Sequence, residues 1–318
     1  MRRALALVML LGACSDRAER PAPAPPSSSP PAGGATDPWN AGPPARDTAP
    51  PAPTDPLPHP FVWAATKDGR TLTLIGTLHA GVDAKDRLPL WAWKRVEAAP
   101  ALAVEVDPLD PDLTAWAVRR HDAPTLREEL GEAYWAKLVD MLGERNLALS
   151  GFSSTAAIAM QVSGYGGNVE ATATMDFILL QRAKTLGKRI VYLETARSQS
   201  ELLASLFTLD ALKRLVDHRD GLPGPNRRMF AAYEEGDLET FAASARQAAA
   251  LQVADEAGLA RLDAALLLDR NRAWIPALEE LHARGDAVVA VGALHLAGKG
   301  SVLELLAARG FEVRRLAE

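Results

Sequence analysis

TLTLIGTLH at residues 71–79 and AVVAVGALH at residues 287–295 are the two stretches of this 318-residue chain that decide its fold. In each stretch a run of five apolar or β-branched residues predicts a short buried strand, which a glycine then ends. In an open α/β sheet, ligands bind in the loops beyond the carboxyl ends of strands. We therefore expect His79 and His295 to meet across one cleft as a metal or acid–base site. The alternative for each is a loop histidine that is hydrogen-bonded to nearby backbone.

Further strands and helices alternate on both sides of these stretches. Residues 61–64, 101–106, 189–193 and 311–315 have strand character, and Asp68-Gly69 is a hairpin signal. Helical patterns cover residues 90–98, 174–186 and 301–308, a long region from about 113 to 160, and much of 201–282. The sequence therefore predicts an α/β fold. It consists of a mixed sheet with flanking helices and a helical insertion between the N- and C-terminal strand–loop–histidine segments.

The first 13 residues have the pattern of a lipoprotein signal peptide. Arg2 and Arg3 precede the apolar run Ala4–Leu11, which is too short to span a bilayer, since that takes about 20 residues. The sequence LGAC at residues 11–14 resembles a bacterial lipobox, which implies cleavage before Cys14 and lipidation of that cysteine. The alternative is an ordinary secretory signal followed by a stray cysteine.

A segment rich in proline and alanine, residues 14–57, separates the signal from the rest of the chain. It has no apolar periodicity and its prolines favour extended backbone, so we expect a disordered tether. The folded domain is expected over residues 58–318. Ser15 stands where an aspartate would resemble an inner-membrane retention signal. It therefore favours the periplasmic face of the outer membrane, with the membrane as a partner through the lipid.

Composition excludes several classes of site. The net charge is −5 and the 35 Lys and Arg residues are scattered, so nucleic acid is not an expected partner. Cys14 is the only cysteine, which excludes an intrachain disulfide and a cysteine-ligated metal. The sequence contains no HExxH, GxSxG or P-loop motif. A hydrolase with this sequence would need a different catalytic arrangement.

Three acidic residues and one arginine are candidates to join the two histidines. Glu105 is expected inside an apolar strand, where a carboxylate is costly to bury unless it is paired or binds a metal. The alternative is a solvent-facing residue of an edge strand. Glu194 ends the next strand, and Asp176 lies in the first turn of a helix, so capping or interaction with the helix dipole are their alternatives. Arg270 would neutralise an oxyanion or hold a carboxylate, unless it is a solvated helix residue.

An ordered set of short motifs in this chain resembles the TraB/GumN family, which is related to the Tiki proteases. Order and spacing agree over roughly residues 60–316. The matching segments are LIGTLH at 74–79, VEVD at 104–107, MDF at 175–177, VYLET at 191–195, YEEGD at 233–237, DRN at 269–271 with Trp274, and VGALHL at 291–296. The resemblance implies an α/β fold with an inserted helical region, and a site built from the two histidines and acidic residues. Tiki-type members look like divalent-metal-dependent proteases.

These features lead us to expect an extracytoplasmic, lipid-anchored, metal-dependent hydrolase that acts on peptides or proteins. His79, Glu105 and His295 would bind Mn²⁺, Co²⁺ or Zn²⁺, since nitrogen and oxygen ligands do not choose sharply among these ions. The metal would activate a water molecule and polarise a carbonyl group.

The remaining candidates would complete the chemistry. Glu194 or Asp176 would act as general base or orient the ligands, and Arg270 would stabilise the oxyanion. A rival role for His79 is that of a general base without a metal. The alternative function is a non-catalytic lipoprotein that binds metal, haem or another ligand of the cell envelope.

Overall fold

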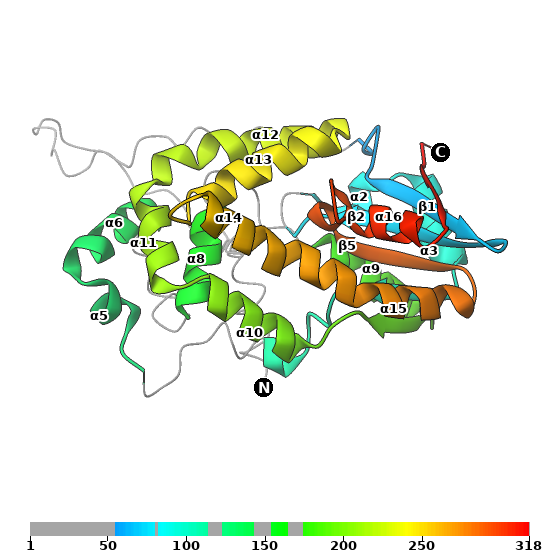
Figure 1. The fold of residues 1–318 in the computed structure, drawn as a ribbon, viewed down its shortest axis with the longest axis horizontal. Coiled ribbons are helices and arrows are strands. Elements are labelled where there is room, and N and C mark those ends of the chain that lie inside the picture. Colours follow the sequence, from blue (N-terminus) through cyan, green and yellow to red (C-terminus); the bar gives the residue numbers. More distant parts are fainter. Residues whose placement is uncertain (1–54, 80–81, 114–122, 143–153, 165–173, 318) are drawn as a thin grey trace, which may run out of the picture.

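The computed structural model describes residues 55–79, 82–113, 123–142, 154–164 and 174–317. A sheet with its covering helices forms one end of the molecule, and a group of helices forms the other (Figure 1). The expected signal peptide, Cys14 and all but the last three residues of the expected tether lie outside the described residues. Within the tether, Leu57 is buried and donates its backbone N–H to the carbonyl of Arg87, so the packed chain includes this residue.

Six strands form one mixed sheet in the order β4-β3-β5-β2-β1-β6, which confirms the predicted sheet. Four neighbouring strands run parallel, and β1 pairs antiparallel with β2 and β6. The carboxyl ends of the four parallel strands therefore lie at one edge of the sheet. The strands are β1 Val62–Lys67, β2 Arg70–Thr77, β3 Ala101–Val104, β4 Arg189–Tyr192, β5 Ala287–Gly292 and β6 Glu312–Arg315.

Two sequence predictions about the strands meet different outcomes. The hairpin at Asp68 and Gly69 is confirmed: both residues have positive φ, 50° and 74°, as the tight turn between β1 and β2 requires. The placement of Glu105 inside a strand is wrong, because β3 ends one residue earlier, at Val104. Two hydrogen bonds continue the pairing with β4 here, from the Leu193 N–H to the Val104 carbonyl at 3.0 Å and from the Glu194 N–H to the Glu105 carbonyl at 2.9 Å, and the chain bends at Glu105 and Val106.

Helices cover both faces of the sheet, because its central strands are apolar on both sides. In β5, Val289 and Val291 pack into one core cluster, whereas Val288 and Ala290 pack into the other. The first face is covered mainly by α15 Asp269–Ala283 and α16 Val302–Ala308, and the second by α3 Leu90–Ala98 and α9 Met175–Thr185. The predicted flanking helices are therefore confirmed.

The helical insertion is also confirmed, and it has a core of its own. Leu138, Ile158, Leu212 and Leu215 are fully buried in this third cluster. Its helices are α5 Leu126–Leu130, α6 Glu132–Leu142, α8 Thr155–Gly164, α10 Ala196–Leu206 and α11 Leu209–Asp217. A pair of long helices, α12 Pro223–Glu235 and α13 Leu238–Ala250, leads on from this part (Figure 1).

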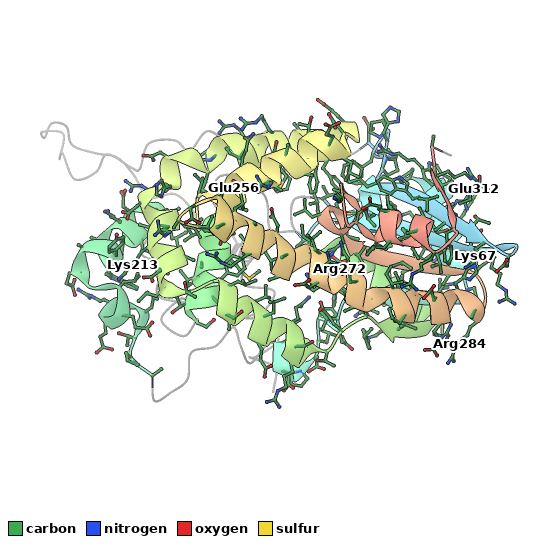
Figure 2. The ribbon with its side chains drawn as sticks, in the orientation of Figure 1. Lys67, Lys213, Glu256, Arg272, Arg284 and Glu312 are labelled. Carbon is green, nitrogen blue, oxygen red and sulfur yellow. The ribbon has the colours of Figure 1, made fainter. Side chains whose placement is uncertain are left out.

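One continuous helical rod returns the chain from the helical part to the sheet (Figure 1). It consists of α14 Glu256–Asp263, a π-helical segment Ala264–Leu268, and α15. Arg272 lies on its solvent-facing side, with 60% of its side chain exposed (Figure 2). The short elements are α2 Ala84–Arg87 and the 3₁₀ turns Arg219–Gly221 and Ala293–Leu296.

Across the part of the chain that the structure describes, no helix has both the length and the apolar character that crossing a bilayer requires.

Candidate functional site

Four neighbouring parallel strands each deliver one candidate residue to the same edge of the sheet. His79 is the second residue after β2, Glu105 directly follows β3, and Glu194 is the second residue after β4. His295 comes three residues after Gly292, the last residue of β5. Because these strands are neighbours and run parallel, their loops face a common region.

Two helices bring the remaining candidates to this region. Asp176 lies in the first turn of α9, which begins at the N-cap Thr174, whose side chain accepts the N–H of Phe177. Arg270 lies in the first turn of α15, directly after the π-helical segment. All six sequence-derived candidates therefore belong to one cluster.

Gly292 is the point where the two histidines meet. A Cβ atom at this glycine would lie 3.3 Å from Glu105 Oε1, 3.6 Å from His295 Cδ2 and 3.9 Å from His79 Nε2. The distance between His295 Cδ2 and His79 Nε2 is therefore no larger than the sum of the last two distances. The glycine leaves open the space between these three groups that a side chain would fill.

Arg270 forms the centre of the buried half of the cluster. Its Nη2 donates to Glu105 Oε2 at 2.6 Å and to Glu194 Oε1, and its Nε donates to Glu194 Oε2 at 3.2 Å. Gln199 Nε2 bridges the same two carboxylates, at 2.9 Å from Glu194 and 3.4 Å from Glu105. Only 9–13% of these three charged side chains is exposed. Buried carboxylates of this kind are tolerated because each is paired and hydrogen-bonded.

The hydrogen bonds of His295 fix which of its ring nitrogens carries the proton. Asn271 donates Nδ2–H to the carbonyl of Gly300 at 2.9 Å, so its Oδ1 faces His295 Nδ1 at 2.6 Å and must accept. The proton is therefore on Nδ1, and the Nε2 lone pair accepts from Arg270 Nη1 at 3.2 Å. The ring also packs against Trp274, with centroids 4.4 Å apart.

His79 forms the exposed half of the cluster with Asp176. Its Nδ1 lies 3.1 Å from Asp176 Oδ2, and the hydroxyl of Thr77 donates to Asp176 Oδ1 at 2.7 Å. Although 68% of the His79 side chain is exposed, protein atoms crowd the ring enough to disfavour its charged form. The carboxylates of Asp176 and then Glu105 outweigh this effect and raise the pKa of His79 to about 9. Nε2 is left to face the space at Gly292.

Burial and neighbouring charge separate the pKa values of chemically similar residues in this cluster. Burial raises the pKa of Glu194, although Arg270 partly offsets it. Burial also acts against ionisation of Glu105, but His295, Arg270 and His79 together lower its pKa to about 2. Burial lowers the pKa of His295 to about 4, against the opposing attraction of Glu105. Pairs of titratable groups separated in this way are typical of acid–base sites.

A divalent metal does not fit this arrangement as it stands. Two imidazoles and a carboxylate are suitable donors in kind. However, among the described residues no group of three or more His, Cys, Asp and Glu side chains is arranged so that it could hold a metal ion. The Nε2 of His295, which a metal would need, already accepts the N–H of Arg270. The arrangement therefore supports no catalytic step through a metal.

Several residues that sequence reasoning did not assign to the site support it. Gln199 contacts Glu194, Asn271 contacts His295, and Thr77 orients Asp176. Tyr233 is buried and donates its hydroxyl to the carbonyl of Gly76 at 2.7 Å, which fixes the strand end before His79. Thr77, Asn271 and Tyr233 lie within the motifs LIGTLH, DRN and YEEGD, whereas Gln199 lies in none of them.

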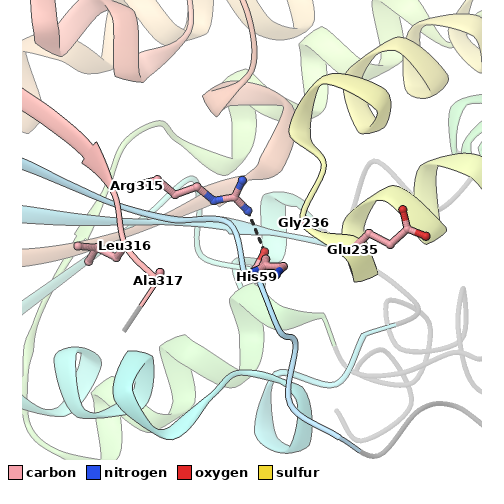
Figure 3. Close-up of a pocket in the computed structure, with 6 residues that line it drawn as sticks. All are labelled: His59, Glu235, Gly236, Arg315, Leu316 and Ala317. Atoms are coloured by element: carbon pink, nitrogen blue, oxygen red, sulfur yellow. Dashed lines mark hydrogen bonds between the residues drawn. The ribbon is translucent and has the colours of Figure 1, made fainter.

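A separate cavity of about 310 Å³ lies where the N-terminal entry of the domain meets its C-terminal end (Figure 3). His59, Glu235, Gly236, Arg315, Leu316 and Ala317 line it. Arg315 crosses it to donate to the His59 carbonyl at 2.8 Å. None of the six candidate residues lines this cavity.

Comparison with known proteins agrees with the motif pattern. The model of the TraB/PrgY/gumN family matches residues 61–315. The chain belongs to this family. The match covers the sheet, the helical part and all six candidate residues, so the two G-x-x-H segments are elements of one family domain.

Two curated relatives are similar over most of their length. The uncharacterized protein YbaP of Escherichia coli (strain K12) is 28% identical over 267 residues, which is 77% of this chain and 93% of YbaP. YbaP of Shigella flexneri is 28% identical over 250 residues, which is 73% of this chain and 86% of that protein. No solved structure matches the chain.

Proposed function

We propose that this protein is a hydrolase of the cell envelope that cleaves peptide-like carbonyl bonds at the cluster around Gly292. One observation carries the proposal: three neighbouring parallel strands bring Glu105, His79 and His295 to a single glycine, and two helices add Arg270 and Asp176 as their partners. His79 Nε2 faces this space and is accessible, so a substrate can reach it. Residues gathered only for stability would not require such an opening.

The charge states suggest a division of roles among the side chains. Glu194, with its raised pKa, is a better proton acceptor than Glu105 and would take a proton from the attacking water. His79, which Asp176 holds by its Nδ1, would donate a proton from Nε2 to the departing amine. Arg270 would keep Glu194 in position. Water adds to the carbonyl carbon, the carbon–nitrogen bond breaks, and a carboxylic acid and an amine leave; the proton on Glu194 then returns to His79 through solvent.

The cellular setting of the proposal rests on residues 1–57 alone. A lipid on Cys14 would anchor the protein in the membrane, at the periplasmic face of the outer membrane, and the tether would connect it to the domain. Metabolic labelling with a radioactive fatty acid tests this. Wild type should be labelled and Cys14→Ser should not, and label on both proteins or neither would contradict the anchor.

The hydrolase proposal is tested with the full chain and a diverse peptide library, whose cleavage products are read by mass spectrometry. Wild type should cleave a subset of peptides, and His79→Gln should lose this activity. His218→Gln is the matched control, because His218 is an exposed histidine in the helical part. Parallel reactions with a chelator or with added Mn²⁺ test the metal dependence expected from the sequence. No cleavage by wild type, or equal cleavage by His79→Gln, would refute the proposal and favour a binding lipoprotein.

A further inference from the structure

Arg270 donates hydrogen bonds to the same residues that the sequence led us to expect as metal ligands and as a general base. Nη2 contacts Glu105 and Glu194, and Nε contacts Glu194 again. Nη1 donates to His295 Nε2 at 3.2 Å and to the carbonyl of Leu266 at 2.9 Å. The guanidinium therefore lies between the two buried carboxylates and the buried imidazole.

The contact with His295 occupies the lone pair that a metal would require. Asn271 fixes the proton on Nδ1, so Nε2 is the only ring nitrogen able to bind a cation. Arg270 Nη1 already donates to this atom. An ion at Nε2 would displace that N–H and would stand within a few ångströms of a permanent positive charge, which repels it.

The fold holds Arg270 in this place. The π-helical segment that precedes it is a local departure from α-helix of a kind often found at functional sites, and its Leu266 carbonyl accepts from the side chain. The guanidinium carbon lies 4.9 Å from the ring centre of Trp274. If Arg270 swung out, Glu105 and Glu194 would remain as buried carboxylates without their cation, which is strongly unfavourable.

We propose that Arg270 is the resident cation of this site and keeps divalent metals away from Glu105 and His295. The planar guanidinium supplies a positive charge to two carboxylates at once, as a metal ion would, and it adds directional hydrogen bonds. This differs from the metal-bound site that the sequence led us to expect. The proposal concerns the cation alone and does not depend on which bond the protein hydrolyses.

Metal binding by the full chain, without any substrate, tests the proposal. The protein is treated with chelator, desalted and titrated with MnCl₂ and ZnCl₂ in a calorimeter. Wild type should show no one-to-one binding at submillimolar metal. Arg270→Gln should bind one equivalent, with an affinity at least about tenfold above the detection limit that wild type does not reach, because a nearby positive charge has been removed. The double variant Arg270→Gln with Glu105→Gln should lose this gain, which assigns the new affinity to this site.

Two further variants make the test specific. Arg272→Gln removes an exposed arginine from the same helix and should bind metal as wild type does. Arg270→Lys keeps the positive charge and should bind metal no more tightly than wild type does. This variant still tests the effect of the charge if Arg270→Gln does not fold. Thermal unfolding of wild type should likewise be unchanged by Mn²⁺, since a ligand that binds the folded state raises Tm. Tight binding of one metal ion by wild type that Arg270→Gln weakens or leaves unchanged would overturn the proposal.

Discussion

Gly292→Ala should remove activity while leaving the fold intact. The backbone at Gly292 has φ −51° and ψ 135°, which any residue can adopt. A methyl group there would lie 3.3 Å from Glu105 Oε1, 3.6 Å from His295 Cδ2 and 3.9 Å from His79 Nε2. Its only tight contact is with a carboxylate oxygen, which needs to shift by a few tenths of an ångström.

The expected effects on stability and activity therefore differ in size. Replacing a glycine at a compatible backbone position stabilises by about 0.4–1 kcal/mol through the unfolded chain, which offsets the tight contact. We expect Tm to stay within roughly 2–4 °C of wild type, the change that about 1 kcal/mol produces in a domain of this size. The methyl group fills the space where the reacting atoms would lie, and displacing a substrate by about 1 Å can reduce its turnover about 100-fold.

Gly76→Ala is the matched comparison, because Gly76 is the equivalent glycine of the first G-x-x-H segment. Its added Cβ would lie 3.0 Å from Phe61 Cβ and 3.2 Å from Ala293 Cα, and neither atom can move freely. Overpacking of this kind costs about 1–3 kcal/mol. Circular dichroism melts and peptide cleavage on both variants separate the two effects. Full cleavage by Gly292→Ala, or a larger loss of Tm for Gly292→Ala than for Gly76→Ala, would refute the reasoning.

Four further predictions follow from the contacts around the histidines. NMR titration of the full chain without added metal should give His79 a pKa of about 9, and Asp176→Asn should lower it, whereas an unchanged value in that variant would contradict the ion pair. Because this pKa lies above its ordinary value of 6.5, the pair's contribution to stability is complete below about pH 6.5 and is lost as pH rises through about 9, which unfolding measured against pH should show. Asn271→Ala leaves a buried imidazole N–H and a backbone carbonyl without partners, at roughly 1–3 kcal/mol for each group in urea unfolding, and a cost near zero would mean that water replaces the amide. Tyr233→Phe removes the hydrogen bond to the Gly76 carbonyl and should cost about 1 kcal/mol in thermal unfolding. If that bond positions His79, the folded variant should also cleave peptides more slowly than wild type. Full cleavage by the folded variant would make the role of Tyr233 purely structural.

The sequence predicted that His79 and His295 approach each other because the rule it used is topological. Parallel strands expose their carboxyl ends at one edge, so the position of His79 and His295 after two apolar runs was sufficient. The same rule placed Glu194 at this edge, because it follows another apolar strand. For Glu105 the apolar pattern extended too far, because Val106 lies beyond the strand and bends away with the loop.

What the sequence did not reveal is the partnership inside the cluster. Arg270 and Glu105 are 165 residues apart, and no local pattern shows that one guanidinium serves both glutamates and an imidazole. The π-helical segment that precedes Arg270 cannot be distinguished from an ordinary α-helix in the sequence, since Ala264–Leu268 contains only alanine and leucine. Gln199 carries no signal at all, because its role depends on where α10 begins relative to β3.

The rod formed by α14, the π-helical segment and α15 connects the helical part directly to the charged cluster. One of its ends packs among the helices and the other lies along the sheet, so a single helical axis connects the helical part to the turn that bears Arg270 and Asn271. A tilt of that axis would therefore move Arg270 and Asn271 together, relative to the Glu105 and His295 side chains that they contact.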